Sequence, residues 1–386
     1  MNLEIRILQG QSRYDIFSVW QSALREALER FGISACVVPV HQDHPPGSNG
    51  NTVSLGFNLV RHWSAENRRN LHVVWAVDHP NFLGQYFLAP YGRMAVDYNH
   101  CVLASVDLRW AEFAREVYGT PGVYFLPHAS VLDKPATPDW SVRPLDVVFF
   151  GSFEEPEALA TRLRESVKTN AAATWPFIET FLNEFRYATG HTLDRAVWDA
   201  MSRLSWPPDI ARVFLNAFYP DLDSYHRYRS RAGVMRSIRK TLVHVYGGGP
   251  WSGLSLPENI VVHDSVTYPE ALRIMRQAKI VLSHAPTLSN GGHERVFDAI
   301  LSGCFVASAE SSFLRCEFPE PAGIQFYDCE ELSGADSLFS RILADPAAPD
   351  RVRIAQQVVL DRHTMTQRAG AVLYILGNRW PERFAE

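Results

Sequence analysis

Residues that could bind an anion are concentrated in the segment SNGGHERVFDAILSGCFV, which covers residues 289–306. Its second half has the apolar spacing of a helix, and Ser289 or Asn290 could cap that helix. Gly291 and Gly292 have no side chains and would let a ligand approach the backbone closely. Because a helix N-terminus offers free N–H groups and the positive end of a dipole, this segment predicts a phosphate site.

The same helix carries further polar side chains. His293, Glu294 and Arg295 fall in its first turn. At roughly 100° per residue, Arg295, Asp298 and Ser302 share one face. An arginine followed one turn later by a carboxylate suits a nucleotide, with the diphosphate at the helix end and the ribose hydroxyls on Asp298. An ordinary capped surface helix would show the same pattern, so this alternative stays open.

Two further glycine turns come directly after predicted strands. Gly151 and Ser152 follow residues 146–150, while Tyr246, Gly247 and Gly248 end the strand at 242–246. In open α/β sheets, ligands bind at the carboxyl ends of strands. Three such turns in one half of the chain favour a nucleotide crevice, although each alone is more often just a tight turn. The spacing matches neither a P-loop nor a dinucleotide fingerprint.

Candidate catalytic side chains lie in the first third of the chain. Asp78 and His79 follow the apolar run 71–77 and could together serve as a general base for a hydroxyl nucleophile. A turn that begins at the aspartate, before Pro80, explains them equally well. Asp15 is a second candidate base, or a simple helix cap.

No metal centre and no cofactor is expected from the sequence. His41, Asp43 and His44 resemble metal ligands, but their loop at 41–51 is rich in Pro, Gly and Asn and lacks a metal-binding spacing. The five cysteines are scattered and none forms a Cys-x-x-Cys pair. Reduced thiols in a cytoplasmic protein are therefore expected.

Composition and charge argue against several classes of protein. The chain has 386 residues and a formal net charge of -5, so a nucleic-acid partner is not expected. The arginine-rich stretch 227–239 is interpreted as a solvated helix face. No run approaches the ~20 apolar residues of a membrane span, and the first residues are typical of a strand rather than a signal peptide.

Strand and helix patterns alternate along both halves of the chain, which predicts an α/β protein with parallel sheets. Strands are expected at 3–8, 35–40, 53–57, 71–77, 101–105, 122–126, 146–150, 242–246, 260–263, 280–283 and 305–308. Helices are expected at 15–30, at 108–118, over a long uninterrupted stretch at about 157–240, and in a tail from about 350 to 380.

The run GGHERVFDAILSGCFVAS resembles the donor-binding segment of group 1 glycosyltransferases, specifically the branch similar to the CgeB spore-maturation proteins. Those enzymes carry an acidic residue, then alanine, then a glycine shortly before a strand, as Asp298, Ala299 and Gly303 do here. Their first glutamate, seven residues earlier, falls on Gly291. The runs DHP, FLPHA, FFGSF, VYGGGPW and DSVTY resemble the same branch. The resemblance thus covers most of the chain outside 157–240.

The resemblance implies a GT-B fold, in which two Rossmann-like domains face each other across a cleft. Residues 1–140 would form the acceptor domain and residues 141–365 the donor domain, with the helical insertion at about 157–240. Residues 366–386 would be a C-terminal helix that returns to the first domain. The backbone near Ser265 and Val266 would meet the base, the 290–295 turn the diphosphate, and Asp298 the ribose.

The implied activity is transfer of a sugar from a nucleotide-sugar donor, a UDP-sugar as first choice, to a hydroxyl or amide of a protein, glycan or lipid. Such enzymes generally need no metal, because a helix dipole and basic side chains stabilise the departing diphosphate. Two alternatives stay open. A nucleotide-sugar epimerase on the same fold would form product from the donor alone. A non-catalytic nucleotide- or sugar-binding protein stays open as well, because glycine stands at position 291 in place of the glutamate.

Overall fold

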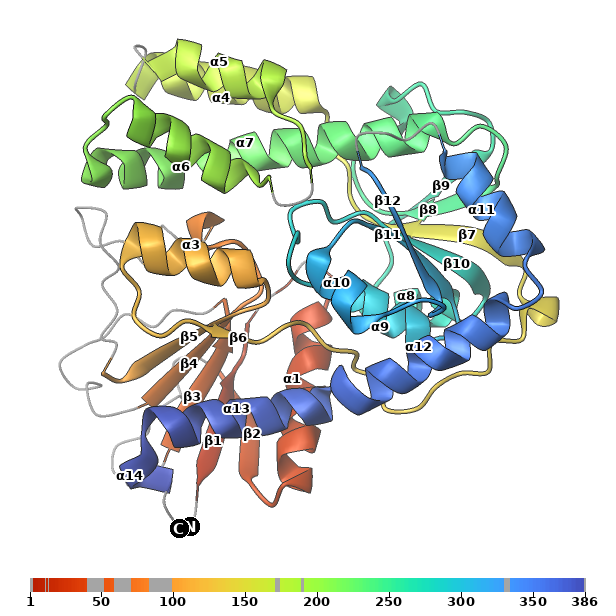
Figure 1. The fold of residues 1–386 in the computed structure, drawn as a ribbon, viewed down its shortest axis with the longest axis horizontal. Helices are drawn as coiled ribbons and strands as arrows, with labels where there is room; N and C mark the ends of the chain where they lie inside the picture. Colours follow the sequence, from red (N-terminus) through yellow and green to blue (C-terminus); the bar gives the residue numbers. More distant parts are fainter. Residues whose placement is uncertain are drawn as a thin grey trace. The chain divides into compact units, whose positions relative to one another are not determined.

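The computed structural model describes residues 3–10, 12, 14–39, 52–58, 71–82, 99–170, 174–188, 191–329 and 334–384. The chain divides into two compact units, Met1–Asp133 with Val359–Glu386, and Lys134–Val358. Each unit is built on one six-stranded sheet whose neighbouring strands all run parallel (Figure 1). The prediction of parallel α/β sheets is confirmed.

The sheet of the first unit has the strand order β2-β1-β3-β4-β5-β6. Its strands are β1 (Glu4–Leu8), β2 (Ser34–Val38), β3 (Thr52–Phe57), β4 (Leu71–Ala76), β5 (Cys101–Ser105) and β6 (Tyr124–Phe125). Its described helices are α1 (Ile16–Arg30), α3 (Leu108–Tyr118), α13 (Met365–Arg379) and α14 (Pro381–Phe384). Every residue of β3, β4 and β5 is buried, as expected for parallel strands covered on both faces.

The C-terminal tail is broken into two helices, whereas the sequence predicted one helical stretch. Helix α12 (Ala348–Arg362) ends before His363, and α13 begins after Thr364, which forms a capping box with Gln367. Backbone hydrogen bonds of Ser130 also stabilise the break between the two helices, because its N–H donates to the His363 carbonyl oxygen at 2.8 Å. Helix α13 then packs against α1 (Figure 1). A capping residue and a backbone partner from residue 130 together stop the helix.

The sheet of the second unit has the order β12-β11-β10-β7-β8-β9. Its strands are β7 (Leu145–Phe150), β8 (Val243–Tyr246), β9 (Ile260–His263), β10 (Ala278–Ser283), β11 (Phe305–Ala309) and β12 (Ile324–Tyr327). Strand β12 was not predicted, because its four residues include Gln325 and lie partly exposed. The helices that flank this sheet are α8 (Tyr268–Met275), α9 (Glu294–Leu301), α10 (Ser312–Glu317), α11 (Ala335–Ala344) and α12.

The predicted helical insertion consists of four helices, α4 (Pro156–Asn170), α5 (Trp175–Glu184), α6 (Leu193–Arg203) and α7 (Pro208–Ser237). The long helix α7 joins the insertion to the sheet (Figure 1). Its last turns place Ala232, Val234 and Met235 in the core that also contains Phe149 of β7 and Val245 of β8. Its earlier turns pack against α4, α5 and α6. The insertion is thus held by a helix that belongs to the sheet's own core.

Candidate functional site

The carboxyl ends of the second unit's strands bring the predicted glycine turns together. Strand β7 lies between β10 and β8. The chain adds β8 and β9 on one side of β7 and then crosses to the other side for β10, β11 and β12, so the strand order reverses at β7. Such a switch point is where open α/β sheets bind ligands. The turn after β7 and the turn after β8 are neighbours, since the Gly151 N–H donates to the Tyr246 carbonyl oxygen at 3.0 Å.

The glycines of these turns are explained by packing of one turn on the other. A Cβ atom on Gly247 would lie 1.9 Å from the carbonyl oxygen of Gly151. A Cβ atom on Gly249 would lie 1.8 Å from the carbonyl oxygen of Phe153, and its φ is +107°. The sequence interpretation assigned these glycines to close approach of a ligand, but loop–loop contact already requires them. Gly248 and Ser152 lie in the same pair of turns.

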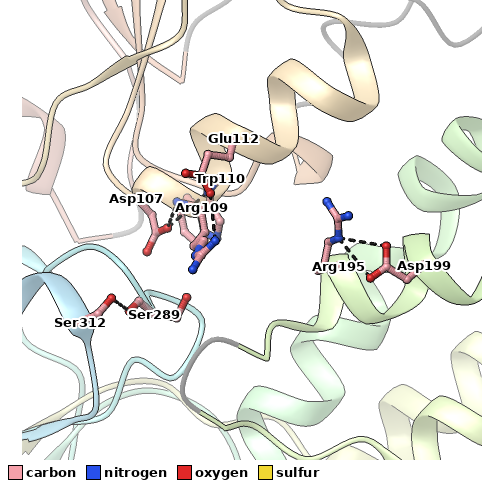
Figure 2. A network of polar contacts seen from close by, with 8 residues as sticks. All are labelled: Asp107, Arg109, Trp110, Glu112, Arg195, Asp199, Ser289 and Ser312. Carbon is pink, nitrogen blue, oxygen red and sulfur yellow. Dashed lines mark hydrogen bonds and ion pairs between the residues drawn. The ribbon is translucent and has the colours of Figure 1, made fainter.

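The N-terminus of α9 differs from the predicted one. The helix begins at Glu294, and His293 is its N-cap instead of Ser289 or Asn290. The helix begins later than predicted because hydrogen bonds to residues 311 and 312 fix the backbone of the 289–292 turn. The Ser289 carbonyl oxygen accepts hydrogen bonds from the N–H and hydroxyl of Ser312, at 3.0 and 3.1 Å (Figure 2). Nδ1 of His293 lies 2.7 Å from the Glu294 carboxylate.

The same turn is tied down at its two glycines. The Gly291 carbonyl oxygen accepts a hydrogen bond from the Ser311 hydroxyl at 2.6 Å. A Cβ atom on Gly292 would lie 2.8 Å from side-chain carbons of Leu314 and Phe297. The turn before α9 is therefore rigid, and its backbone is held ready before any ligand arrives.

Asp298 is not on an exposed polar face. Its exposed fraction is 0%, and its carboxylate accepts a hydrogen bond from the hydroxyl of Tyr268, the first residue of α8. Ser302, on the same face, also has an exposed fraction of 0%. Because the carboxylate has no accessible surface, a ribose could contact it only after Tyr268 moves away.

Arg295 and Arg231 are two arginines whose positive charges repel each other. Arg295 is half-buried, and burial is the main cause that lowers the pKa of its guanidinium. Arg231, on α7, has an exposed fraction of 8%. Burial, followed by repulsion from Arg227, lowers the pKa of Arg231 to about 9, and repulsion from Arg295 adds to the shift.

Arg231 is positioned by the turn after β7 and by aromatic rings. Its guanidinium donates to the Ser152 carbonyl oxygen and lies 5.5 Å from the ring centre of Phe149 and 5.4 Å from that of Tyr228. Its Nε atom is buried without a hydrogen-bond partner among the described residues. The sequence interpretation placed the stretch 227–239 on a solvated helix face, which is wrong for Arg231. The sequence signal that could have identified Arg231 as a site residue is the cluster of arginines at 227–239, close to the predicted turn at 246–248.

Two further side chains at this edge were missed by sequence reasoning. His284 follows β10, and its Nδ1 lies 3.0 Å from the hydroxyl of Tyr327 on β12. Burial, and to a lesser extent Arg231, lowers the pKa of His284 to about 3. His284 is therefore neutral at physiological pH, and its buried Nε2 has no hydrogen-bond partner within the described ranges. A single histidine after a strand carries no distinguishing sequence pattern.

The loop after β9 contains the predicted base-contacting residues. Ser265 is exposed and Val266 is half-buried. Nearby strand ends carry stacked rings, because Tyr246 lies 4.5 Å from His263 at an interplanar angle of 11° and 5.6 Å from Phe150 at 22°. Tyr246 is thus stacked between two rings beside the glycine turns, and its faces are occupied by these neighbours.

The predicted general-base candidates of the first unit, Asp78 and His79, differ in solvent accessibility. Asp78 is exposed, and its carboxylate accepts a hydrogen bond from the Asn58 side chain at 2.7 Å. His79 has an exposed fraction of only 3% and packs edge-on against Trp110 at 5.2 Å. Its Nδ1 accepts a hydrogen bond from the Asn81 N–H. The two neighbours thus make separate contacts instead of the expected joint arrangement.

Asp15 and Asp107 occupy helix starts in the first unit. Asp15 is the exposed N-cap of α1, has a φ of 58°, and makes no side-chain capping bond. Asp107 is fully buried and caps α3 by accepting from the N–H groups of Arg109 and Trp110 (Figure 2). Asp107 is therefore committed to structure, whereas the carboxylate of Asp15 is not used for capping.

The candidate metal ligands named from the sequence belong to the loop at 41–51. His41, Asp43 and His44 lie outside the described residues. Within the described ranges, no group of three or more His, Cys, Asp or Glu side chains is placed to hold a metal ion. Among the helices that the structure describes, none is both long and apolar enough to cross a membrane.

Comparison with known proteins matches this architecture to a class. Residues 229–374 match the family model described as glycosyl transferase-like. Solved structures with a similar fold include AviGT4, a glycosyltransferase involved in avilamycin A biosynthesis, at a TM-score of 0.53, 10% identity and 98% coverage of both chains. Sucrose-phosphate synthase from Thermosynechococcus elongatus aligns at a TM-score of 0.53 and 10% identity over 99% of both chains.

A third similar structure is a T4 phage BGT mutant in complex with UDP-glucose, with a TM-score of 0.51 and 10% identity over 97% of this chain and 99% of that one. No curated protein sequence matches the chain. The two parallel sheets with flanking helices thus have the fold of GT-B glycosyltransferases. Within the chain, residues 229–374 match a glycosyl transferase-like domain, and the predicted GT-B fold is confirmed.

Proposed function

We propose that this protein transfers a sugar from a nucleotide-sugar donor, with a UDP-sugar as first choice, to a hydroxyl or amide of a protein, glycan or lipid. We further propose that it belongs to the CgeB-like branch that the 291–308 run resembles. The observation that carries the proposal is the pair Arg231 and Arg295 at the carboxyl edge of the second sheet. The similar fold of a T4 phage enzyme bound to UDP-glucose supports the choice of donor.

The two arginines differ in what balances their charge, because Glu294 and Asp298 favour the charged form of Arg295. The groups that favour the charged form of Arg231 are the tyrosines Tyr228 and Tyr327, not a carboxylate. Keeping a buried guanidinium charged without an anion is costly, so a bound anion is favoured. Two planar guanidiniums and the positive dipole end of α9 match the oxygens of a diphosphate.

The remaining donor contacts follow from the neighbouring loops. The turns at Gly151–Ser152 and Tyr246–Gly248 and the backbone of 290–293 would line the diphosphate and sugar, and Ser265 and Val266 the base. For the ribose we propose that Tyr268 makes the direct contact and that Asp298 positions its hydroxyl. This changes the role first expected for Asp298, because its carboxylate is inaccessible.

In an inverting transfer, a base removes the proton of the acceptor hydroxyl while that oxygen bonds to the anomeric carbon. The bond from this carbon to the diphosphate oxygen breaks, and the nucleoside diphosphate leaves with the electron pair. We propose Asp78 as this base and Asp15 as the second candidate, because both carboxylates are exposed, while His79 is buried. The two arginines stabilise the leaving diphosphate without a metal, so turnover should persist in EDTA.

Titration calorimetry with UDP tests the donor site. Replacing Arg295 with alanine should weaken UDP binding by roughly tenfold or more, as expected for loss of a charge-assisted hydrogen bond. Arg231→Lys keeps the positive charge but not the planar guanidinium and should weaken UDP binding less than Arg295→Ala does. Arg236→Ala removes an exposed arginine from the same helix and should leave affinity unchanged. Equal UDP affinity in all four proteins would refute the site.

Product analysis separates transfer from epimerisation. With UDP-sugar alone, a transferase yields no epimer, whereas an epimerase forms one without any acceptor. All five cysteines are free thiols, which supports the proposal of a reducing, cytoplasmic location. The proposed partners are the donor and the acceptor, without a nucleic acid.

A further inference from the structure

The helical insertion contains a groove of about 860 Å³ that the donor site does not use. Its long walls are α5 and α6, with Phe185 and His191 toward one end and Trp206 toward the other. Helix α6 has 11 residues, so the groove is about 16 Å long. Its volume is within the ~300–1,000 Å³ typical of ligand sites. All its lining residues belong to the insertion.

One side of the groove is a row of aromatic rings. Phe177, Phe181 and Trp206 are half-buried and line the groove. The ring centres of Phe177 and Phe181 are 5.1 Å apart, and those of Phe177 and Trp206 are 5.4 Å apart. Half-buried rings with fixed neighbours provide flat apolar surfaces at little entropic cost. Such surfaces suit the C–H faces of sugar rings.

The groove is also lined by charges that cancel. Arg195 and Asp199 form an ion pair at 2.9 Å along α6, shown in Figure 2, with 46% and 41% of their side chains exposed. Arg203 and Glu184 add one charge of each sign. Guanidinium donors and carboxylate acceptors in one groove suit hydroxyl groups. The equal charges do not favour a polyanion, and an acyl chain would place its methylenes against four charged side chains.

We propose that this groove binds a neutral oligosaccharide and so holds the glycan portion of an acceptor. The role of the glycan as acceptor rests on the proposed function, but glycan binding itself is measured independently of donor binding. A second, smaller cavity lies between the insertion and the donor edge. Beyond Phe185, Tyr187 and Ala188 line a cavity of about 40 Å³ together with Ser289 and Glu310, which lie in loops at the carboxyl edge of the sheet.

An array of neutral and sialylated oligosaccharides, probed with the labelled full chain, provides the test. Thr180→Trp fills the groove from an exposed position on α5 and should lower glycan binding by roughly tenfold or more. Thr161→Trp on α4 is the matched control, because both threonines are exposed and both hydroxyls donate to a carbonyl oxygen four residues earlier. The control should bind as the wild type does.

The outcomes separate this inference from the proposed function. Retention of neutral glycans that is lost in Thr180→Trp, with unchanged UDP affinity, supports the groove. Absence of any neutral glycan signal, or equal binding by Thr180→Trp, overturns it even if UDP binds. Displacement of a fluorescent fatty acid in place of glycans would also overturn it. Failure of UDP binding alone would count against the donor site only.

Discussion

The insertion contains a buried histidine whose replacement should change the acid sensitivity of the protein. His226 lies on α7 with an exposed fraction of 1%. Its ring is surrounded by Phe185 at 5.0 Å, Tyr225 at 5.1 Å and Tyr187 at 6.4 Å. Neither ring nitrogen makes a hydrogen bond of normal geometry with the described residues. Burial, and then Arg229, lowers the pKa of His226 from 6.5 to about 3.

The sign of the effect follows from proton binding. As the pH falls, the unfolded chain takes up a proton at this histidine near 6.5, while the folded protein does not until about 3. The free energy of unfolding therefore decreases with falling pH in this window. From about pH 8 to about pH 5 the loss from this one group is about 2 kcal/mol.

Replacing His226 with phenylalanine should remove this loss. Phenylalanine has a similar shape and no nitrogen to protonate or to leave unpaired, so the variant should be at least as stable near neutral pH. Scanning calorimetry at several pH values measures the effect. For a unit of this size, about 2 kcal/mol corresponds to about 4–8 °C in Tm. The wild type should lose that much more Tm than the variant between about pH 8 and about pH 5.

His191→Phe is the matched control, because His191 is exposed in the same insertion and stacks on the same Phe185 ring at 5.4 Å. This control should keep the acid sensitivity of the wild type. If His226→Phe loses as much Tm on acidification as the wild type, the burial argument is refuted.

Two other predictions concern the donor edge. Gly247→Ala should destabilise the protein by about 1–3 kcal/mol, because its Cβ would lie 1.9 Å from a backbone oxygen. Gly253→Ala is the control, because a Cβ atom there would meet nothing within 4 Å. Equal urea midpoints of the two variants would contradict the packing explanation. Asp298→Ala should cost about 1–3 kcal/mol in urea unfolding by removing the carboxylate that accepts from the Tyr268 hydroxyl, so this variant changes stability as well as binding. The Tyr268→Phe/Asp298→Ala double variant should recover part of that cost, and strict additivity would argue against the hydrogen bond.

Much of the fold could be predicted because it follows from local patterns. Buried strands such as Leu71–Ala76 and Cys101–Ser105 are short apolar runs, and their alternation with helices already implies parallel sheets. The prediction was weakest where a contact with a residue far away in the sequence ends a helix or completes a strand. The break at Thr364 depends on Ser130, far away in the chain, and β12 is a strand only because β11 pairs with it.

By itself, the sequence determined the parallel α/β architecture and the location of the turn that leads into α9. Gly292, Arg295 and Asp298 stand at a strand-to-helix junction whatever surrounds them, because turn and helix preferences act over a few residues. Only the tertiary structure decided what those residues do. It buried Asp298 against Tyr268, it required Gly247 for packing instead of ligand approach, and it brought Arg231 to Ser152 from 79 positions away in the chain. Burial and long-range neighbours set charge and accessibility, and neither is encoded in a local pattern.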